Sequence, residues 1–298
     1  MFLRLPKVLH LEITNRCNAK CPMCRRTWMD PAPADLPFSL INDRFQNHTF
    51  DRIKYCGSNG DPLMATDFLD FATFFSFRSK EQLIHTNGCL RNKKFWQDLA
   101  QIPNVKVSWG IDGVDQETHV KYRVDTFLDR ILENAKSFND AGGYSQWSFI
   151  KFRHNQDQID TAKQMAMDLG FKEFEVIDTR RFGFKDENVF TYEHNGVTIN
   201  LEKPDGNDIT MVSGKKIICK AQKQEEIYID ASGTVWACTY MADDEELPGP
   251  NIKDHEFSNI VFDRYFDSIT TSWKSNPCDA CLLNCKHGWS NKHEIYEL

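Results

Sequence analysis

The sequence lacks the features that would assign it to a membrane, secreted or nucleic-acid-binding class. None of its apolar runs approaches the roughly 18 residues of a transmembrane helix, and the N-terminal MFLRLPKVLHLEIT does not have the pattern of a signal peptide. Basic residues are outnumbered, with 36 Lys and Arg against 43 Asp and Glu and a net charge of −7. Phosphate binding relies on a basic surface. We therefore expect a cytoplasmic protein without a membrane or nucleic-acid partner.

Cysteine, by contrast, is frequent, because the 298 residues include ten. Ten cysteines would form a disulfide framework in a small secreted domain, but in a long chain without an export signal they favour metal binding or catalysis. Cys56 and Cys89 are isolated in the sequence, and an isolated cysteine on a strand is usually a small buried hydrophobic residue. The other eight form a first group of Cys17, Cys21 and Cys24 and a second group of Cys219, Cys238, Cys278, Cys281 and Cys285.

Two kinds of apolar segment alternate along residues 8–178. Short runs rich in β-branched and aromatic residues predict strands at 8–13, 52–57, 82–88, 105–113, 147–152 and 174–177. Apolar residues spaced three to four apart predict helices at 67–77, 93–100, 127–141 and 158–169, the third of them closed by Gly142 and Gly143. This alternation predicts an α/β fold with a parallel sheet, in which chemistry gathers in the loops that follow the strands.

The pattern changes after Arg181. Residues 190–202 and 227–238 have the alternation of β-hairpins, with turns at Asn195-Gly196 and Ser232-Gly233. We therefore divide the chain into an α/β domain of residues 1–181 and a smaller cysteine-bearing domain of residues 182–298.

The first cysteine group has the spacing C-x3-C-x2-C directly after the first predicted strand. A structural zinc site needs four protein ligands, so these three cysteines would require a further histidine or thiol. A redox pair of the C-x2-C type would leave Cys17 unexplained. A four-iron cluster held by three thiolates leaves one iron open for a small molecule.

Several further motifs follow this cysteine loop in order. They are Gly57-Ser58-Asn59-Gly60-Asp61-Pro62 after the second predicted strand, His85-Thr86-Asn87-Gly88 after the third, and Ser108-Trp109-Gly110-Ile111-Asp112-Gly113 with Tyr122-Arg123 after the fourth. Together with C-x3-C-x2-C, they make residues 8–178 resemble the radical S-adenosylmethionine (SAM) superfamily. The first of them is similar to the family's glycine-rich "GGEP" loop, and the last to the "SIDG…YR" segment of maturase-like members.

The resemblance implies a partial (β/α)6 TIM barrel and a reaction. Cys17, Cys21 and Cys24 would hold a 4Fe–4S cluster whose open iron binds SAM, and reductive cleavage would give a 5′-deoxyadenosyl radical that abstracts hydrogen. The residues implied as SAM contacts are Met23, Gly60, Asp61, Pro62, Asn87, Ser108, Asp112 and Arg123. Two of them depart from the family pattern: Asp61 replaces the usual Glu, and Met23 stands where an aromatic residue is common, although its thioether can pack on a ring.

The second cysteine group combines a hairpin with a distant C-x2-C pair, which judged alone favours zinc. Beside a radical SAM domain it resembles the "SPASM/twitch" extensions, which carry auxiliary iron–sulfur clusters. Five cysteines cannot supply the eight ligands of two clusters, so we expect one auxiliary 4Fe–4S cluster. Cys219, Cys238, Cys278 and Cys281 are its preferred ligands, and Cys285 is either a spare or the true fourth ligand in place of Cys278 or Cys281.

The resemblance favours an oxidoreductase that oxidises, dehydrogenates or forms a bond in a small molecule, with a reducing partner such as flavodoxin or ferredoxin. The first strand starts near Val8, which leaves no room for an N-terminal leader-binding domain and favours a small substrate over a peptide. The same chemistry on a peptide or protein side chain, and a non-catalytic zinc- or cluster-stabilised binding protein, stay as alternatives. Lys151 and Arg153 either bind an acidic substrate group or form salt bridges, as do Arg180 and Arg181 beside Asp178.

Overall fold

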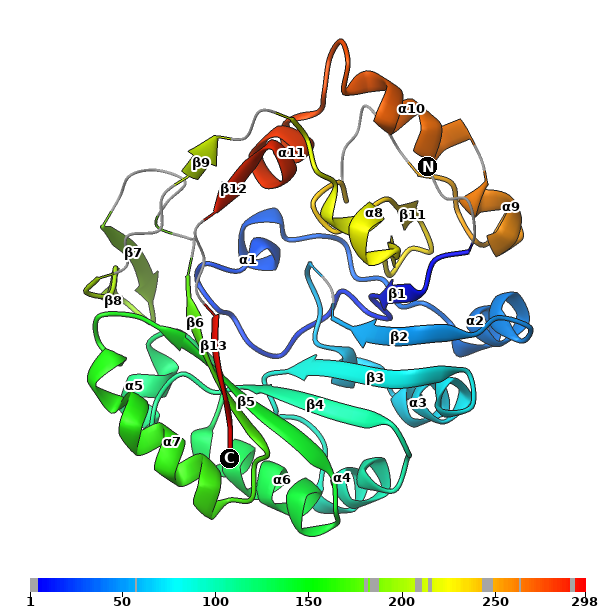
Figure 1. Ribbon diagram of the computed structural model, residues 1–298. Coiled ribbons are helices and arrows are strands. Elements are labelled where there is room, and N and C mark those ends of the chain that lie inside the picture. The colour runs from blue at the N-terminus through cyan, green and yellow to red at the C-terminus, as the bar shows by residue number, and fades with distance from the viewer. Residues whose placement is uncertain are drawn as a thin grey trace. The chain divides into compact units, whose positions relative to one another are not determined.

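The computed structural model consists of two compact units, each assembled from separate segments of the chain (Figure 1). The first unit contains Met1–Arg16, Pro31–Ile84 and Val212–Gly288, and the second contains Cys17–Asp30, His85–Met211 and Trp289–Leu298. The structure describes residues 5–56, 58–179, 182, 188–206, 211–213, 216–242, 249–262, 264–289 and 293–298. Residue 181 lies outside these ranges, so the domain boundary placed there stays a prediction.

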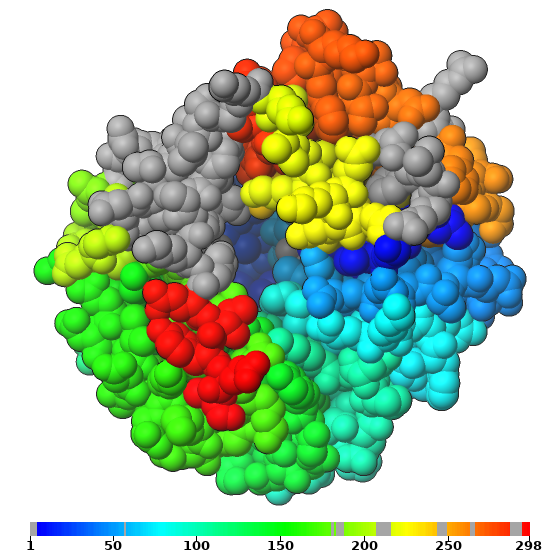
Figure 2. Space-filling model, viewed as in Figure 1, coloured from blue at the N-terminus to red at the C-terminus, as the bar shows by residue number. Residues whose placement is uncertain are grey.

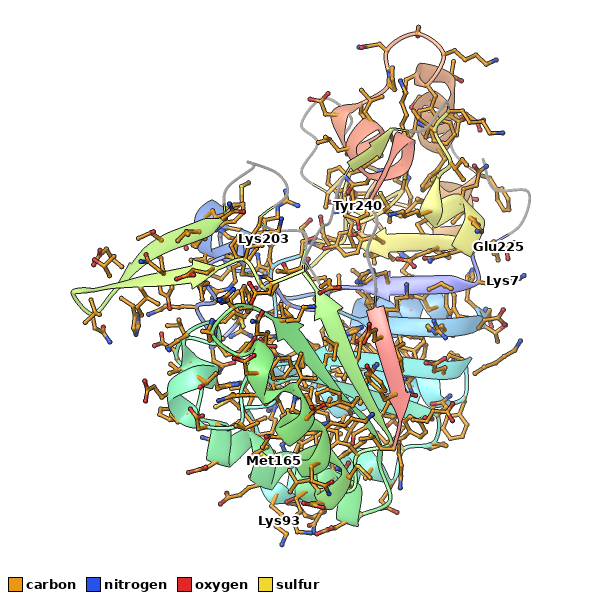
Figure 3. The ribbon with its side chains drawn as sticks, turned by 60° about the vertical axis from the view of Figure 1, so that its left-hand side comes forward. Lys7, Lys93, Met165, Lys203, Glu225 and Tyr240 are labelled. Carbon is orange, nitrogen blue, oxygen red and sulfur yellow. The ribbon has the colours of Figure 1, made fainter. Side chains whose placement is uncertain are left out.

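The first unit is built on a mostly parallel sheet. Its strands are β1 (Val8–Leu11), β2 (Phe50–Tyr55), β3 (Ser79–Thr86), β10 (Glu226–Ile229) and β11 (Val235–Trp236). Strand β1 pairs in parallel with both β2 and β10, β2 pairs in parallel with β3, and β11 closes the edge antiparallel to β10. Lys7 and Glu225, which precede β1 and β10, form an ion pair at 2.6 Å and lie at the same end of these strands (Figure 3).

Helices surround this sheet and contribute aromatic side chains to its core. They are α2 (Phe38–Phe45), η1 (Pro62–Met64), α3 (Phe68–Ser76), α8 (Lys220–Gln224), α9 (Phe257–Val261), α10 (Arg264–Ser272), α11 (Asp279–Cys281) and η3 (Leu282–Lys286). Phe45 of α2 and Phe257 of α9 pack with their ring centroids 4.8 Å apart, and Phe50 and Phe75 complete the cluster. The C-terminal segment therefore shares a core with the first strands of the chain.

The second unit has its own parallel strands, β4 (Val105–Gly110), β5 (Tyr144–Lys151) and β6 (Glu173–Asp178). Strand β13 (His293–Glu297) pairs antiparallel with β6 and lies at the molecular surface, as the group of red atoms that adjoins the green segment in Figure 2. The helices of the unit are α1 (Arg25–Met29), α4 (Lys93–Ala100), α5 (Gln116–Val120), α6 (Leu128–Asp140), η2 (Gln156–Gln158) and α7 (Ile159–Asp168). Trp96, Trp109 and Trp147 are fully buried in its core.

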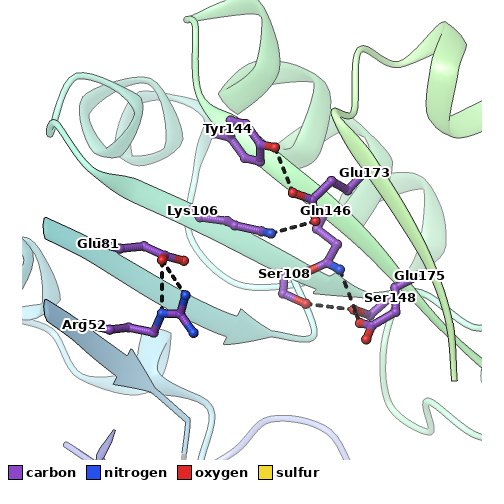
Figure 4. Close-up of polar contacts among 9 residues, drawn as sticks. All are labelled: Arg52, Glu81, Lys106, Ser108, Tyr144, Gln146, Ser148, Glu173 and Glu175. Carbon is purple, nitrogen blue, oxygen red and sulfur yellow. Dashed lines mark hydrogen bonds and ion pairs between the residues drawn. The ribbon is translucent and has the colours of Figure 1, made fainter. Parts of the chain in front are cut away.

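Polar side chains join the strands of the second unit. Lys106 of β4 forms an ion pair with Glu173 of β6 at 2.6 Å, and the hydroxyl of Tyr144 donates to the same carboxylate (Figure 4). Ser108 and Ser148 share a hydrogen bond at 2.8 Å on the neighbouring strands β4 and β5. The parallel register of this unit is therefore reinforced by side chains as well as by the backbone.

The predicted mixture of helices and mostly parallel strands is confirmed. The two predicted hairpins are present as well, one of β7 (Val189–His194) and β8 (Val197–Glu202) and the other of β10 and β11. Two short strands that the sequence patterns did not indicate are β9 (Met211–Ser213) and β12 (His287–Trp289). Within the part of the chain that the structure describes, no helix is both long and apolar enough to cross a membrane.

Candidate active site: two groups of cysteines

The first cysteine group lies in the second unit, in a loop braced by α1. The backbone N–H of Cys24 donates to the carbonyl of Cys21 at 3.0 Å, and the hydroxyl of Thr27 donates to that same carbonyl at 2.9 Å. The indole Nε1 of Trp28 donates to the carbonyl of Pro22 at 2.9 Å. The start of α1 therefore fixes the conformation of the loop between the second and third cysteines.

Asn87, a predicted SAM contact, lies beside this loop. Its Nδ2 is 3.7 Å from Sγ of Cys17 and donates to Oδ1 of Asn18 at 2.9 Å. Its Oδ1 accepts from the backbone N–H of Cys89, which fixes the side chain on the turn after β3. Gly88 has φ of +74°, and a side chain there would run into the ring of Trp109. The turn thus requires glycine and holds Asn87 against the first cysteine.

An apolar cluster packs against the cysteine loop. Cys21 and Met23 are buried in it together with Tyr122 and Phe152, whose ring centroids are 4.8 Å apart. Tyr192 of β7 packs against the same cluster, and burial together with the nearby Cys21 raises its pKa to about 12. Its hydroxyl donates to the carbonyl of Lys121 at 2.7 Å.

Sequence reasoning missed Tyr192 because it lies on a hairpin beyond the predicted α/β domain. A signal for it exists in the sequence, since the aromatic residues Phe190 and Tyr192 alternate with the polar residues Thr191 and Glu193. Such a residue on a polar strand indicates a face that packs against something else.

Arg123 and Asp112 form a buried ion pair near the cysteine loop. Nε of Arg123 donates to Oδ2 of Asp112 at 2.6 Å, and the Asp112 side chain is inaccessible to solvent. Burial lowers the pKa of Arg123, but the charges of Asp112 and Cys21 more than offset this, so the pKa is raised and the guanidinium stays charged. A Cβ on Gly110 would collide with the guanidinium. Ser108, another predicted SAM contact, shares a hydrogen bond with Ser148.

The predicted SAM contacts Gly60, Asp61 and Pro62 lie in the first unit, in the loop after β2. The backbone N–H of Asp61 donates to the carbonyl of Arg16 at 2.9 Å, and the Asp61 carboxylate accepts from the N–H of Leu63 at 3.0 Å. Asp61 therefore caps the short helix η1, in which Pro62 is the first residue. Gly57, at the start of this motif, lies outside the described residues.

The second cysteine group surrounds one cavity of the first unit, with a volume of about 270 Å³. Cys219, Cys238, Cys281 and Cys285 line it together with His10, Lys54 and Glu226. Cys278 interacts electrostatically with both Cys238 and Cys281. Five cysteines from three separate stretches of the chain are thus brought together, the most distant of them 66 residues apart in sequence (285 − 219).

The thiols of this group perturb one another. A hydrogen bond from Cys219 lowers the pKa of Cys285 to about 6, and the same bond raises the pKa of Cys219. Burial raises the pKa of Cys238 to about 11, and burial also raises that of Cys281. Such coupling is expected where several thiols face one small space, and thiolates are the ligands of zinc and of iron–sulfur clusters.

The sequence profile of the family described as "Radical SAM superfamily" matches residues 11–165, more than half of the chain. The chain belongs to the radical SAM superfamily. The match contains the first cysteine group, the loop after β2, Asn87 and the Arg123–Asp112 pair, so the predicted family is confirmed.

Two relatives resemble this radical SAM chain over different lengths. An AdoMet-dependent heme synthase of Methanosarcina barkeri is 25% identical over 192 residues, which is 61% of this chain and 54% of that protein. The mycofactocin maturase MftC of Mycolicibacterium smegmatis is 20% identical over 94% of this chain and 76% of its own. The chain therefore spans about half the length of the heme synthase.

A solved structure shares the fold of this radical SAM chain. Streptococcus suis SuiB bound to S-adenosylmethionine superposes with a TM-score of 0.67 and 14% identity, covering 95% of this chain and 72% of SuiB. The mixed α/β fold with mostly parallel strands is thus shared with a solved structure that contains bound S-adenosylmethionine.

Neither cysteine group of this radical SAM chain is arranged as a single-ion site. Among the residues that the structure describes, no three His, Cys, Asp or Glu side chains converge on one metal-ion position. A tetrahedral zinc site places four donors about 2.0–2.3 Å from one point. A four-iron cluster distributes its thiolates over separate irons, so the sulfurs stand further apart.

The basic residues near the ends of β5 and β6 are engaged in ion pairs. Lys151 pairs with Asp178 at 2.7 Å, and Arg153 pairs with Asp205. Of the two interpretations of these residues, the structure thus favours salt bridges over an anion site. Arg180 and Arg181, the other residues of that prediction, lie outside the described ranges.

Proposed function

We propose that the protein is a radical SAM enzyme in which Cys17, Cys21 and Cys24 hold a 4Fe–4S cluster. The observation that carries the proposal is the braced three-cysteine loop within the matched family region, packed on one side by apolar residues and met by the Asn87 amide. When bound, such a cluster supplies the electron that cleaves SAM to methionine and a 5′-deoxyadenosyl radical, which abstracts hydrogen from a substrate.

Several side chains around this loop have roles toward the cofactors that their contacts support. Asn87 holds Cys17 by its amide, and Met23 offers an apolar, polarizable surface to a ring. Arg123 keeps a positive charge close to Cys21, which stabilises a thiolate. The similarity of the loop of Gly60, Asp61 and Pro62 to the family's glycine-rich loop supports a role for its backbone in binding the amino group of SAM.

The cavity in the first unit is proposed to hold one auxiliary 4Fe–4S cluster in a twitch-like extension of residues 182–298, and residues 1–181 are proposed to form a partial barrel. Cys219, Cys238 and Cys281 line the cavity, which supports all three as ligands. The C-x2-C spacing supports Cys278 as the fourth ligand, whereas lining of the cavity supports Cys285.

The reaction that we propose is an oxidation, dehydrogenation or bond formation on a small molecule. The alternative substrate is a peptide side chain, which the likeness to MftC, a maturase, and to SuiB, crystallised with the precursor peptide SuiA, supports. Both versions need a one-electron donor such as flavodoxin or ferredoxin. A non-catalytic, zinc-stabilised binding protein is the competing proposal of another class.

Anaerobic reconstitution with iron and sulfide tests these proposals. The enzyme is expected to bind about eight irons per chain, as two four-iron clusters, and to release 5′-deoxyadenosine when SAM and dithionite are added. A variant with Cys17, Cys21 and Cys24 changed to Ala should lose about four irons and all cleavage of SAM.

Cys89→Ala is the control, because Cys89 is buried, as Cys21 is, but belongs to neither cysteine group, and its thiol accepts a hydrogen bond from the N–H of Phe127. This variant should keep both clusters and the cleavage activity. Stoichiometric zinc in the purified protein, or intact clusters that never cleave SAM, would count against the enzyme. Stimulation of 5′-deoxyadenosine release by small molecules or by peptides distinguishes the two substrate classes.

A further inference from the structure

A buried carboxylate outside the predicted site holds the loop that follows β2. Glu12 is 2% exposed and follows β1. One of its oxygens, Oε1, accepts hydrogen bonds from the backbone N–H groups of both Asn59 and Gly60, each at 2.9 Å. The other oxygen accepts from the hydroxyl of Tyr228 on β10. All of these residues belong to the first unit.

These bonds decide which way the loop presents its backbone. A trans peptide group points its N–H and its C=O in opposite directions, and the described residues contain no cis peptide bond. Because the N–H groups of Asn59 and Gly60 turn toward Glu12, the carbonyls of Ser58 and Asn59 turn away from it. Carbonyl oxygens are the acceptors that an ammonium group requires.

The loop has little freedom to change this arrangement. A Cβ on Gly60 would overlap the carbonyl oxygen of Thr14, so the loop backbone is pressed against the chain that follows β1. Burial raises the pKa of Glu12, while the hydrogen bonds from Tyr228, Asn59 and Gly60 lower it in part. A carboxylate buried in this way is unfavourable unless its donors stay in place, so each of the three donors is needed.

Tyr228 connects this loop with the C-terminal part of the chain. It is fully buried and lies on β10, outside the matched family region of residues 11–165. It pairs in register with His10 of β1, and it also forms a side-chain hydrogen bond with Ser58. Glu226, two residues before it and therefore on the same face of β10, lines the cavity of the second cysteine group.

We propose that Glu12 and Tyr228 are positioning residues for SAM, which orient the loop of Ser58, Asn59 and Gly60 so that its carbonyls receive the amino group of the ligand. This inference rests on the proposed function, and it makes SAM binding depend on a strand of the C-terminal part. Neither side chain touches the ligand itself; both act through the loop backbone.

Conservative variants of the reconstituted enzyme test the proposal. Tyr228→Phe removes one hydroxyl and keeps the buried ring, and it should weaken SAM binding by about 10-fold, the effect of losing one hydrogen bond to a charged group. The KM for SAM should rise while the maximal rate of 5′-deoxyadenosine release at saturating SAM is retained. The change that SAM causes in the EPR spectrum of the reduced cluster should require correspondingly more SAM.

Tyr55→Phe is the matched control. Tyr55 is also fully buried in the first unit, and its hydroxyl donates to Oε1 of Gln82 on β3 at 2.9 Å. Both variants should lose thermal stability to a similar extent, but only Tyr228→Phe should lose SAM affinity. Glu12→Gln should weaken SAM binding as well, and in the double variant with Tyr228→Phe the two effects should be less than additive.

Unchanged SAM affinity in Tyr228→Phe overturns the positioning role, and so does an equal loss in Tyr55→Phe. Strictly additive effects of Glu12→Gln and Tyr228→Phe also contradict it, because the two side chains would then act separately. A wild-type protein with intact clusters that binds no SAM would instead remove the proposed function, and this inference with it. The two failures are therefore distinguishable by the wild-type titration.

Discussion

The guanidinium Nε of Arg123 donates a hydrogen bond of 2.6 Å to Oδ2 of Asp112. The side chain of Asp112 is inaccessible to solvent. The second carboxylate oxygen, Oδ1, accepts from the backbone N–H of Ile150, also at 2.6 Å. Both oxygens of Asp112 are therefore engaged within the protein. The contacts assign Asp112 the task of holding Arg123, whose charge acts on Cys21.

We expect Asp112→Asn to destabilise the protein strongly. The change leaves the buried guanidinium of Arg123 without its counter-charge, and breaking a buried ion pair in this way costs about 3–5 kcal/mol of the free energy of unfolding. Denaturant unfolding followed by circular dichroism measures the loss. Asp140→Asn is the control, because the pair of Asp140 with Lys136 is exposed and contributes less than about 0.5 kcal/mol. Equal losses in the two variants would contradict a special role for the buried pair.

We expect Gly60→Ala to disturb the loop that follows β2. The new Cβ would meet the carbonyl of Thr14, so the loop must shift at a cost of about 1–3 kcal/mol. SAM binding, measured by equilibrium titration of the reconstituted protein, should weaken because the loop carbonyls move with the backbone.

A variant at a second glycine distinguishes the effect of backbone strain from the effect of displacing the loop. Gly142 has φ of +93° and open space around it, so Gly142→Ala costs about 1–2 kcal/mol through backbone strain alone. This variant should bind SAM as the wild type does. If Gly142→Ala and Gly60→Ala lower SAM affinity equally, the effect is one of global stability and the loop argument is wrong.

Elements specified by local patterns could be predicted from the sequence. The helix expected from apolar spacing at 127–141 is observed as α6, and the helix expected at 93–100 has these same bounds in α4. The turn expected at Asn195-Gly196 has φ of +52° and +76° at its two residues, as a type I′ hairpin turn requires. In each case the determining residues are neighbours in the sequence.

Contacts between distant segments could not be predicted in this way. Strand β13 pairs with β6 over more than 100 residues of sequence, and Tyr228 reaches Glu12 across 216 residues. No periodic pattern of apolar residues in the sequence indicates which distant segments pair. The cysteine spacings indicated two groups, and the second group does enclose one cavity, but which four of its cysteines hold a cluster stays a prediction.

The choice between Cys278 and Cys285 is open to a direct test. If the cavity-lining Cys285 is the fourth ligand, Cys285→Ala should lose or alter the second cluster, seen as a drop of up to about four irons per chain and a changed EPR signal. Cys278→Ala should then keep both clusters. The first cluster and its cleavage of SAM should persist in both variants, because its three ligands are untouched.

The reverse result identifies Cys278 as the ligand and Cys285 as the spare. Cys219, which is hydrogen-bonded to Cys285, provides an internal check, because every proposed ligand set includes Cys219. Cys219→Ala should therefore remove the second cluster in either case. Retention of both clusters in Cys219→Ala would contradict the site itself.

His119 should make the stability depend on pH. Its ring is fully buried between the N–H of Asp112 and the hydroxyl of Thr126, and burial together with the charge of Arg123 lowers its pKa from 6.5 to about 3. Between these two pH values His119 is protonated in the unfolded chain and neutral in the folded chain. Its contribution to the free energy of unfolding is therefore complete above pH 6.5 and decreases as the pH falls, by about 2 kcal/mol at pH 5. Unfolding curves at pH 7 and pH 5 measure this difference. His119→Gln should reduce it by about the same amount, and an unchanged difference in that variant would show that other groups control the acid sensitivity.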